Sequence, residues 1–434
     1  MIVQHSKKTN YYLFFILCCT ALYYLICIVL RGRGIQTIFV NDTNNTFMDF
    51  FNSIANANID PYRDGFSNYP AMACLLYKFF MHIVPAPVRE IGSFQLRNLQ
   101  QAMLVFILYN VVSLWIISAT IDHKSLKLDN ARYLLSLVVL SCAPMMFTLE
   151  RGNLILLSFA FSVFFAFNHD SKNKLVREVA FISLAIAAAI KIYPAILGLI
   201  ILKQKRYKEV FRLLIYGLIA FLAPFFYYDG IDSLAIMIQA LGFTSNLTSE
   251  IGYGVNVGLY NICETIALIF GWSRSPAAIY AVHIIVLGIL IVGFFTLKKK
   301  WQEWMCLCLL IVLLPKTNYY YIMIFLLIPF VEWLNESNEK GILFSSENWK
   351  NSLLFALFLI PLPLPQVRMF LEYKFVLSYS MLIYYLALLC SCVVIFSATI
   401  DQVFAGKRVA KRIGNVAGII VLLFSIVCVF ATLV

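Results

Sequence analysis

Asp49 is the first residue whose surroundings suggest chemistry. It lies in Phe47-Met-Asp-Phe-Phe51, so its carboxylate is placed among large apolar side chains just after the first long apolar segment. A carboxylate in such surroundings is costly to bury unless it is paired or used. A positioned carboxylate can act as a general base. Asp is also a favoured helix N-cap, so the same residue could simply begin a helix.

Three cations, Arg151, Lys191 and Lys316, occur at short polar breaks between apolar segments. An unpaired charge at the end of an apolar helix costs free energy. Arg and Lys side chains that face a cavity suit a phosphate or pyrophosphate, because Arg makes bidentate contacts and Lys supplies a point charge. Alternatively, each side chain could extend towards the lipid headgroups. The breaks are Glu150-Arg-Gly-Asn153, Lys191-Ile-Tyr-Pro194 and Pro315-Lys-Thr-Asn318.

Other common site motifs are absent from the sequence. There is no P-loop, GxGxxG or HExxH pattern, which argues against an ATP-driven pump and a zinc protease. The eleven cysteines lie almost all inside apolar segments and form no metal-ligand spacing. No Asp-x-Asp pair is placed to hold a metal. We therefore expect neither a metal site nor a cofactor.

The composition indicates a membrane protein. Of the 434 residues, 62% are hydrophobic and 13% charged, and the mean hydropathy is +0.83. A spanning helix needs roughly 20 apolar residues. We expect an all-α polytopic membrane protein, a single transmembrane domain over residues 1–434 with about 11–13 membrane segments. Apolar segments lie near 11–30, 101–121, 133–149, 153–168, 179–190, 192–202, 213–228, 277–297, 304–314, 319–334, 351–365, 375–398 and 413–434.

The basic residues predict which loops face the cytoplasm. The formal net charge is +12, and Lys and Arg gather in short clusters between apolar segments, a pattern typical of cytoplasmic loops rather than of nucleic-acid binding. With a cytoplasmic N-terminus, the loops on that side hold 22 of the 34 Lys and Arg. This topology leaves two extracytoplasmic loops, at about 34–99 and 229–275. Within the first, residues 69–84 read as an amphipathic interfacial helix.

Three apolar stretches are expected to fold back as hairpins. Basic clusters flank residues 179–202 on both sides, which requires an even number of crossings. Two short half-helices that turn near Lys191 satisfy this requirement if the turn is buried in protein or lines a watery cavity. Residues 133–168 and 304–334 have the same form. Their charged tips would all lie on the extracytoplasmic side.

The motifs together resemble a known family. In order, they are Asp49-Phe-Phe-Asn-Ser-Ile, Asp60-Pro-Tyr-Arg-Asp-Gly, Asn68-Tyr-Pro-Ala, Glu150-Arg-Gly-Asn153 and Ala189-Ile-Lys-Ile-Tyr-Pro194. Over roughly residues 10–330 the chain is similar to the GT-C class glycosyltransferases that use polyprenyl-phosphate sugars, specifically glycosyltransferase family 87. Members usually show Tyr-Pro-Pro where this chain has Tyr69-Pro-Ala71.

The resemblance implies an inverting hexosyltransferase with a GT-C-like bundle. It would move a hexose, often mannose, from a polyprenyl-phosphate donor to a lipid or glycan acceptor on the extracytoplasmic face of a bacterial plasma membrane, as part of cell-envelope glycan synthesis. By the same resemblance, Asp49 would be the general base, and Arg151, Lys191 and Lys316 would bind the donor phosphate. The sugar or acceptor would contact Tyr69, Asn153, Tyr193, Asn256 and Asn318.

Two other functions fit parts of the pattern. An O-antigen-type polymerase also needs a large extracytoplasmic loop and cationic sites, but its long loop usually comes later in the chain. A transporter or flippase for an anionic or lipid-linked substrate would use broken half-helices with charge at membrane depth. Transporters more often show an internal repeat, and none is visible here.

Overall fold

The computed structural model describes residues 2–32, 43–65, 67–84, 92–251, 256–272, 275–346, 348–362, 366–370, 374–404, 416 and 420. The regular secondary structure of these residues is helical, apart from one short hairpin of two antiparallel strands, β1 (Gln366–Phe370) and β2 (Lys374–Ser378). Strand β1 falls between the predicted apolar segments 351–365 and 375–398, and β2 overlaps the start of the second, so the hairpin was not anticipated from the sequence.

Five helices among the described residues are long and apolar enough to cross a membrane. A sixth is counted if the bent pair of helices at residues 131–151 is one span. Six shorter apolar helices of 10–17 residues accompany them, and the predicted segment 413–434 lies outside the described residues except for two positions. The chain is an all-α polytopic membrane protein, as predicted. The candidate spans are Lys7–Val29, Gln100–Lys124, Tyr207–Tyr227, Pro276–Thr296 and Tyr379–Val403.

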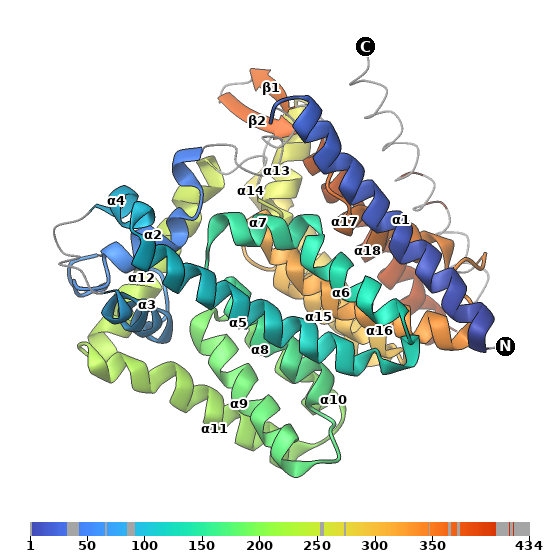
Figure 1. The fold of residues 1–434 in the computed structure, drawn as a ribbon, viewed down its shortest axis with the longest axis horizontal. Coiled ribbons are helices and arrows are strands. Elements are labelled where there is room, and N and C mark those ends of the chain that lie inside the picture. The colour runs from blue at the N-terminus through green and yellow to red at the C-terminus, as the bar shows by residue number, and fades with distance from the viewer. Residues whose placement is uncertain are drawn as a thin grey trace. The chain divides into compact units, whose positions relative to one another are not determined.

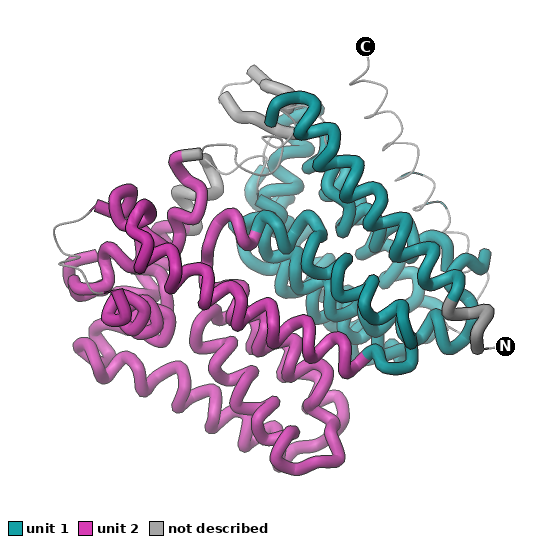
Figure 2. The backbone as a smooth tube through the Cα atoms, viewed as in Figure 1, with its two compact units in different colours: residues 1–41, 125–147, 248–434 teal, residues 42–124, 148–247 magenta. Residues whose placement is uncertain are grey.

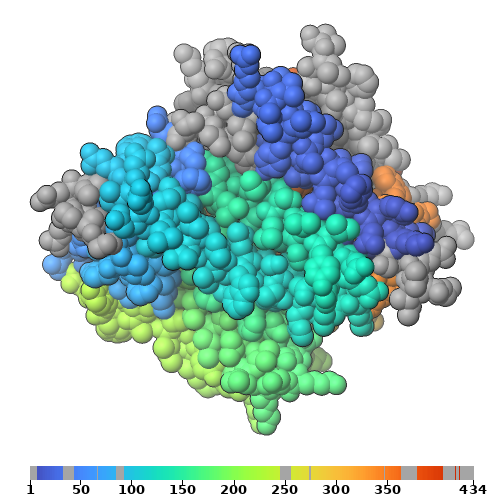
Figure 3. Space-filling model, viewed as in Figure 1, coloured from blue at the N-terminus to red at the C-terminus, as the bar shows by residue number. Residues whose placement is uncertain are grey.

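Helix α1 (Ile2–Val29) illustrates why these helices suit a bilayer. One side is buried through Leu13 and Ile16, whereas Phe14 and Ile28 on the outer side are 59% and 73% exposed. In Figure 3 the helix, in dark blue, runs uncovered along the surface. Such continuous apolar exposure is unfavourable in water and favourable against lipid chains.

The chain divides into two compact units, shown in Figure 2. Unit 2 comprises residues 42–124 and 148–247. Its long helices α5, α8, α9 and α11 pack against one another in that order (Figure 1). Its elements are η2 (Thr43–Asn45), α2 (Met48–Ala55), α3 (Ala71–Ile83), α4 (Ser93–Asn98), α5 (Gln100–Lys124), α8 (Ile155–Asn168), α9 (Lys174–Ile190), η5 (Tyr193–Gly198), α10 (Leu199–Lys203), α11 (Tyr207–Leu222), η6 (Ala223–Tyr227) and α12 (Ile231–Ile251), whose last residues belong to unit 1.

Unit 1 comprises residues 1–41, 125–147 and 248–434. Helix α15 lies between α14 and α16, and α18 packs on α14, while α1 packs on α6 and α16. The core is lined by large aromatic residues such as Trp304 and Trp333, both fully buried. Besides α1 and the hairpin, its elements are η4 (Leu126–Leu128), α6 (Ala131–Ser141), α7 (Ala143–Arg151, ending in unit 2), α13 (Leu259–Ile269), α14 (Pro276–Thr296), α15 (Lys300–Leu313), η7 (Tyr320–Leu326), α16 (Leu327–Lys340), α17 (Trp349–Leu359) and α18 (Tyr379–Phe404).

The helices break at the three places where the sequence predicts hairpin tips. Helix α7 ends at Arg151 and α8 begins at Ile155, α9 ends just before Lys191, and α15 ends before the Pro315–Asn318 break. The helix predicted at 69–84 is present as α3, and its interfacial position stays a prediction. These breaks leave polar residues at helix ends, where their side chains can serve a site.

Gly258 packs directly against the backbone of the Pro315–Asn318 break, which leaves no room for a side chain. The nitrogen of Val257 donates to the carbonyl of Asn318 at 2.6 Å. A Cβ added at Gly258 would lie 2.4 Å from the Pro315 carbonyl oxygen and 2.9 Å from that of Lys316. Since both atoms belong to the backbone, they cannot rotate away.

We predict that Gly258→Ala destabilises the protein by about 1–3 kcal/mol because it overpacks this contact. Thermal unfolding in detergent measures the loss. The matched control is Gly288→Ala in α14, where the added Cβ meets nothing within 4 Å and should leave stability unchanged or slightly raise it. Equal melting temperatures for the two variants would contradict this packing.

Candidate functional site

The start of α2 is anchored on the turn between α7 and α8. Phe47, which precedes α2, has a left-handed backbone with φ of 64°, and its nitrogen donates to the Glu150 carbonyl at 2.7 Å. Gly152 in the turn has φ of +69°, and a Cβ there would lie 3.2 Å from the Phe47 oxygen and 3.0 Å from the Phe106 ring. Only glycine meets both demands at low cost. This contact brings residues 151 and 153 beside the first turn of α2.

Asp49 receives two side-chain hydrogen bonds from that turn. Nη2 of Arg151 donates to Oδ1 at 2.5 Å, and Nδ2 of Asn153 donates to Oδ2 at 3.1 Å. The side chains of Asp49 and Arg151 are 20% and 28% exposed. The carboxylate is thus held by one donor on each oxygen while part of it stays accessible. A carboxylate has about four lone-pair positions, so it can accept further protons or hydrogen bonds.

Asn153 connects the carboxylate to the surrounding elements. Its Nδ2 also donates to the hydroxyl of Tyr69 at 3.0 Å, and its Oδ1 accepts from the nitrogen of Ile155 at 3.1 Å, at the start of α8. The Tyr109 hydroxyl donates to its backbone oxygen at 2.8 Å. These bonds fix which end of the amide faces Asp49, because the oxygen is already used by a backbone donor.

Tyr69 links this group to Lys191. The Lys191 ammonium lies 4.2 Å from the centre of the Tyr69 ring, a cation–π contact. Burial raises the pKa of the Tyr69 phenol well above its usual value, and the nearby Tyr77 and the negative charge of Asp49 add to the shift, so the hydroxyl stays protonated. Tyr193, at the start of η5, also interacts electrostatically with Tyr69. Unit 2 therefore gathers Asp49, Arg151, Asn153, Tyr69, Lys191 and Tyr193.

The other three predicted site residues belong to unit 1 and lie near one another. Asn256 and Tyr319 form an isolated antiparallel bridge, and the Lys316 ammonium lies 4.9 Å from the Tyr260 ring. Nδ2 of Asn318 donates to the carbonyls of Ile311 and Val312 at the end of α15, at 2.9 and 3.0 Å. The roles of Lys316, Asn256 and Asn318 in substrate binding stay predictions.

One alternative from the sequence is wrong. Asp49 is not the N-cap of α2: Phe47 occupies that position, without a side-chain capping bond, and Asp49 lies inside the first turn. Two structural residues were missed, Gly152 and Tyr109. A glycine in a polar break between apolar segments was a usable signal for Gly152, whereas nothing in the local sequence marked Tyr109 as a partner of Asn153.

Across the described residues, no three His, Cys, Asp or Glu side chains gather as a possible metal site. The expectation of metal-independent chemistry stays a prediction.

Comparison with known families places the chain. The sequence model of glycosyltransferase family 87 matches residues 69–329, which is more than half of the chain. The chain belongs to glycosyltransferase family 87. No curated protein and no solved structure matches it. The matched part contains Tyr69, Arg151, Asn153, Lys191 and Lys316, whereas Asp49 precedes it.

Family 87 membership makes the protein a membrane glycosyltransferase. The predicted family and enzyme class are confirmed, and a transporter or flippase is disfavoured. Its reaction brings a sugar donor and an acceptor together.

We predict that Asn153→Ala lowers transferase activity and stability together, since it removes the donor to Asp49 and leaves the buried Ile155 nitrogen without its acceptor, at about 1–3 kcal/mol. Asn153→Ser separates the two effects. Its hydroxyl can still accept from Ile155 but is too short to hold Asp49. The Ser variant should melt closer to the wild type than the Ala variant yet lose activity at least tenfold. Full activity in the Ser variant would show that Asn153 does not position Asp49.

Proposed function

We propose that this family 87 enzyme transfers a hexose, mannose being the first candidate, from a polyprenyl-phosphate donor to a hydroxyl of a lipid or glycan acceptor, with inversion at the anomeric carbon. The observation that carries the proposal is the position of Asp49, a half-buried carboxylate fixed by Arg151 and Asn153 and joined through Tyr69 to Lys191. A base and two cations at one place are what such a displacement requires.

In the proposed step, the acceptor oxygen attacks the anomeric carbon of the donor sugar. Its proton passes to Asp49, the new carbon–oxygen bond forms, and the bond from the anomeric carbon to the phosphate oxygen breaks. The bonding electrons leave with the lipid phosphate, whose negative charge increases. Fixed cations in a water-poor site stabilise that charge more strongly than the same cations in water.

Arg151 can serve both partners of the reaction. Its guanidinium has five N–H donors, and one of them bonds to Asp49. A guanidinium can contact a carboxylate and a phosphate through different N–H groups. Lys191 adds a second positive charge on the Tyr69 side. The arrangement therefore supports a donor phosphate next to the base.

The proposed topology places this chemistry on the extracytoplasmic face of a bacterial plasma membrane, with the N-terminus in the cytoplasm. The basic clusters at 172–177 and 203–212 support it, because both ends of the α9–α10 stretch would then face the cytoplasm. A lipid-linked donor also explains how an enzyme without a nucleotide-sugar motif obtains an activated sugar.

We predict that Asp49→Asn lowers transfer from a radiolabelled polyprenyl-phosphate mannose in isolated membranes by about 10²–10⁴-fold, the usual contribution of a general base. Asp129→Asn is the matched control, since Asp129 is exposed in a loop and has a positive φ that Asn tolerates. The control should retain wild-type transfer at equal expression. Near-normal turnover in Asp49→Asn would remove the proposed base.

We predict that Lys191→Gln raises KM for the donor about 10–100-fold, since it removes a charged contact to the phosphate. Arg151→Lys should also weaken donor use, because Lys lacks the fork that can bond to a carboxylate and a phosphate together. Lys127→Gln is the control, since Lys127 forms an exposed ion pair with Glu339. Unchanged donor KM in both site variants would contradict the phosphate assignment.

A further inference from the structure

A row of polar side chains continues from Asp49 along one face of α2. Asn52, Ser53 and Asn56 follow Asp49 at three, four and seven positions, the spacing of one helix face. The opposite face is apolar and buried, through Met48, Phe50, Phe51 and Ile54. The helix thus presents amide and hydroxyl groups in line with the proposed base.

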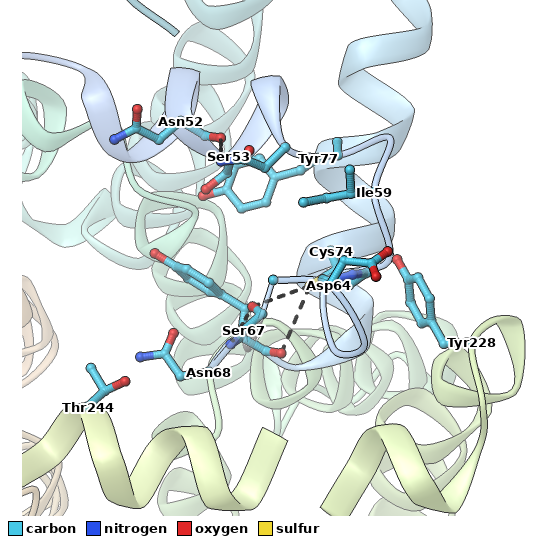
Figure 4. Close-up of a pocket in the computed structure, with 15 residues that line it drawn as sticks. Asn52, Ser53, Ile59, Asp64, Ser67, Asn68, Cys74, Tyr77, Tyr228 and Thr244 are labelled. Atoms are coloured by element: carbon cyan, nitrogen blue, oxygen red, sulfur yellow. Dashed lines mark hydrogen bonds between the residues drawn. The ribbon is translucent and has the colours of Figure 1, made fainter. Parts of the chain in front are cut away.

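This polar row forms one wall of a cavity of about 590 Å³ within unit 2. Figure 4 shows Asn52 and Ser53 on one side of it, with Asn68 and Thr244 across from them. Binding sites for small molecules typically have volumes of about 300–1,000 Å³. The cavity is therefore large enough for a ligand of the size of a small saccharide.

The loop that closes the cavity is held in shape by its own hydrogen bonds. Oδ1 of Asp60 accepts from the nitrogens of Tyr62 and Arg63, both at 2.9 Å. The buried Tyr62 donates its hydroxyl to the Tyr69 carbonyl at 2.8 Å and packs on Phe225. A wall fixed in this way is preorganised for a ligand, which lowers the entropic cost of binding.

Tyr69 belongs both to the cavity wall and to the cluster around Asp49. It is part of the cavity wall, while its hydroxyl bonds to Asn153 and its ring carries the Lys191 ammonium. A ligand that contacts Tyr69 in the cavity would therefore touch a residue that is hydrogen-bonded to Asn153, the partner of Asp49. The cations Arg151 and Lys191 are not among the described residues that line it.

The chemistry of the wall suits a neutral sugar. Asn52, Asn56 and Asn68 can donate to and accept from hydroxyl groups, and the rings of Tyr69 and Tyr228 offer apolar surfaces for a pyranose face. Asp64 is the only charged side chain among the described lining residues, and its charge would repel a phosphate. The buried Tyr77, 2% exposed, lies beside Ser53 in the same wall.

We propose that this cavity is the acceptor subsite and that the acceptor presents a neutral, hydroxyl-rich saccharide to Asp49. The inference rests on the proposed function and extends it by naming the acceptor class. The sugar end of the acceptor lies along the α2 row, with its reacting hydroxyl at Asp49, while the donor phosphate is held by Arg151 and Lys191 outside the cavity.

The first test measures binding without catalysis. Saturation-transfer NMR on the detergent-solubilised full chain uses methyl α-mannoside as the probe and compares the wild type, Asp49→Asn and the double variant Asn52→Ala with Asn56→Ala. The probe should bind to the first two proteins about equally and to the double variant about tenfold more weakly, the combined effect of two hydrogen bonds. No binding to the wild type, or equal binding to the double variant, would overturn the subsite.

The second test separates acceptor use from donor use. In membranes with endogenous acceptor, transfer from radiolabelled polyprenyl-phosphate mannose should fall about tenfold or more in the double variant, while donor cleavage by water in the purified enzyme stays at the wild-type rate. A parallel fall of both rates would overturn the acceptor assignment.

The control for both tests is Asn98→Ala, which removes an exposed amide at the end of α4 and should change neither probe binding nor the two rates. Melting temperatures of all variants identify any that fail to fold. If wild-type membranes transfer no mannose while the NMR result holds, the proposed donor is wrong and the saccharide site stands.

Discussion

The site depends on one close contact, in which the turn between α7 and α8 rests against the first turn of α2. Gly152 makes the approach possible, since its backbone has a positive φ and no side chain separates it from Phe47. The left-handed backbone of Phe47 is costly for a bulky residue, and the bond from its nitrogen to the Glu150 carbonyl helps to offset that cost. This contact places Arg151 and Asn153 within hydrogen-bond distance of Asp49, about a hundred residues earlier in the chain.

Around that contact, the Asn153 amide bonds to several groups at once. Asn153 uses its oxygen at the start of α8 and its nitrogen on Asp49 and Tyr69. Such networks have few alternative arrangements, because rotating one amide would break several bonds at once. The carboxylate is therefore presented in a defined orientation before any substrate arrives. This preorganisation suits chemistry in which a proton leaves one substrate as negative charge develops on the other.

The short helix α2 has one apolar, buried face and one polar face. Its apolar face packs against rings such as Phe106 and Tyr109 of α5, which holds the helix firmly. Its polar face starts with Asp49 and continues into the cavity. Eight residues thus provide both the packing that fixes the site and the groups that would contact an acceptor. The cations proposed for the donor phosphate come from the ends of other helices, at breaks in apolar segments.

The sequence alone determined the class of fold and the breaks in its helices, because hydropathy, basic loops and polar interruptions act locally. It also indicated the family and every residue of the Asp49 cluster that bonds through a side chain, apart from Tyr109. It did not determine which of these residues meet, since contacts between positions 49, 69, 153 and 191 depend on how helices pack. The N-cap alternative for Asp49 was excluded only by the observed start of α2. The grouping of Asn256, Lys316 and Asn318 in unit 1 likewise arises from tertiary packing. So does the cavity beside α2, because Tyr228 and Thr244 line it together with residues 52–77.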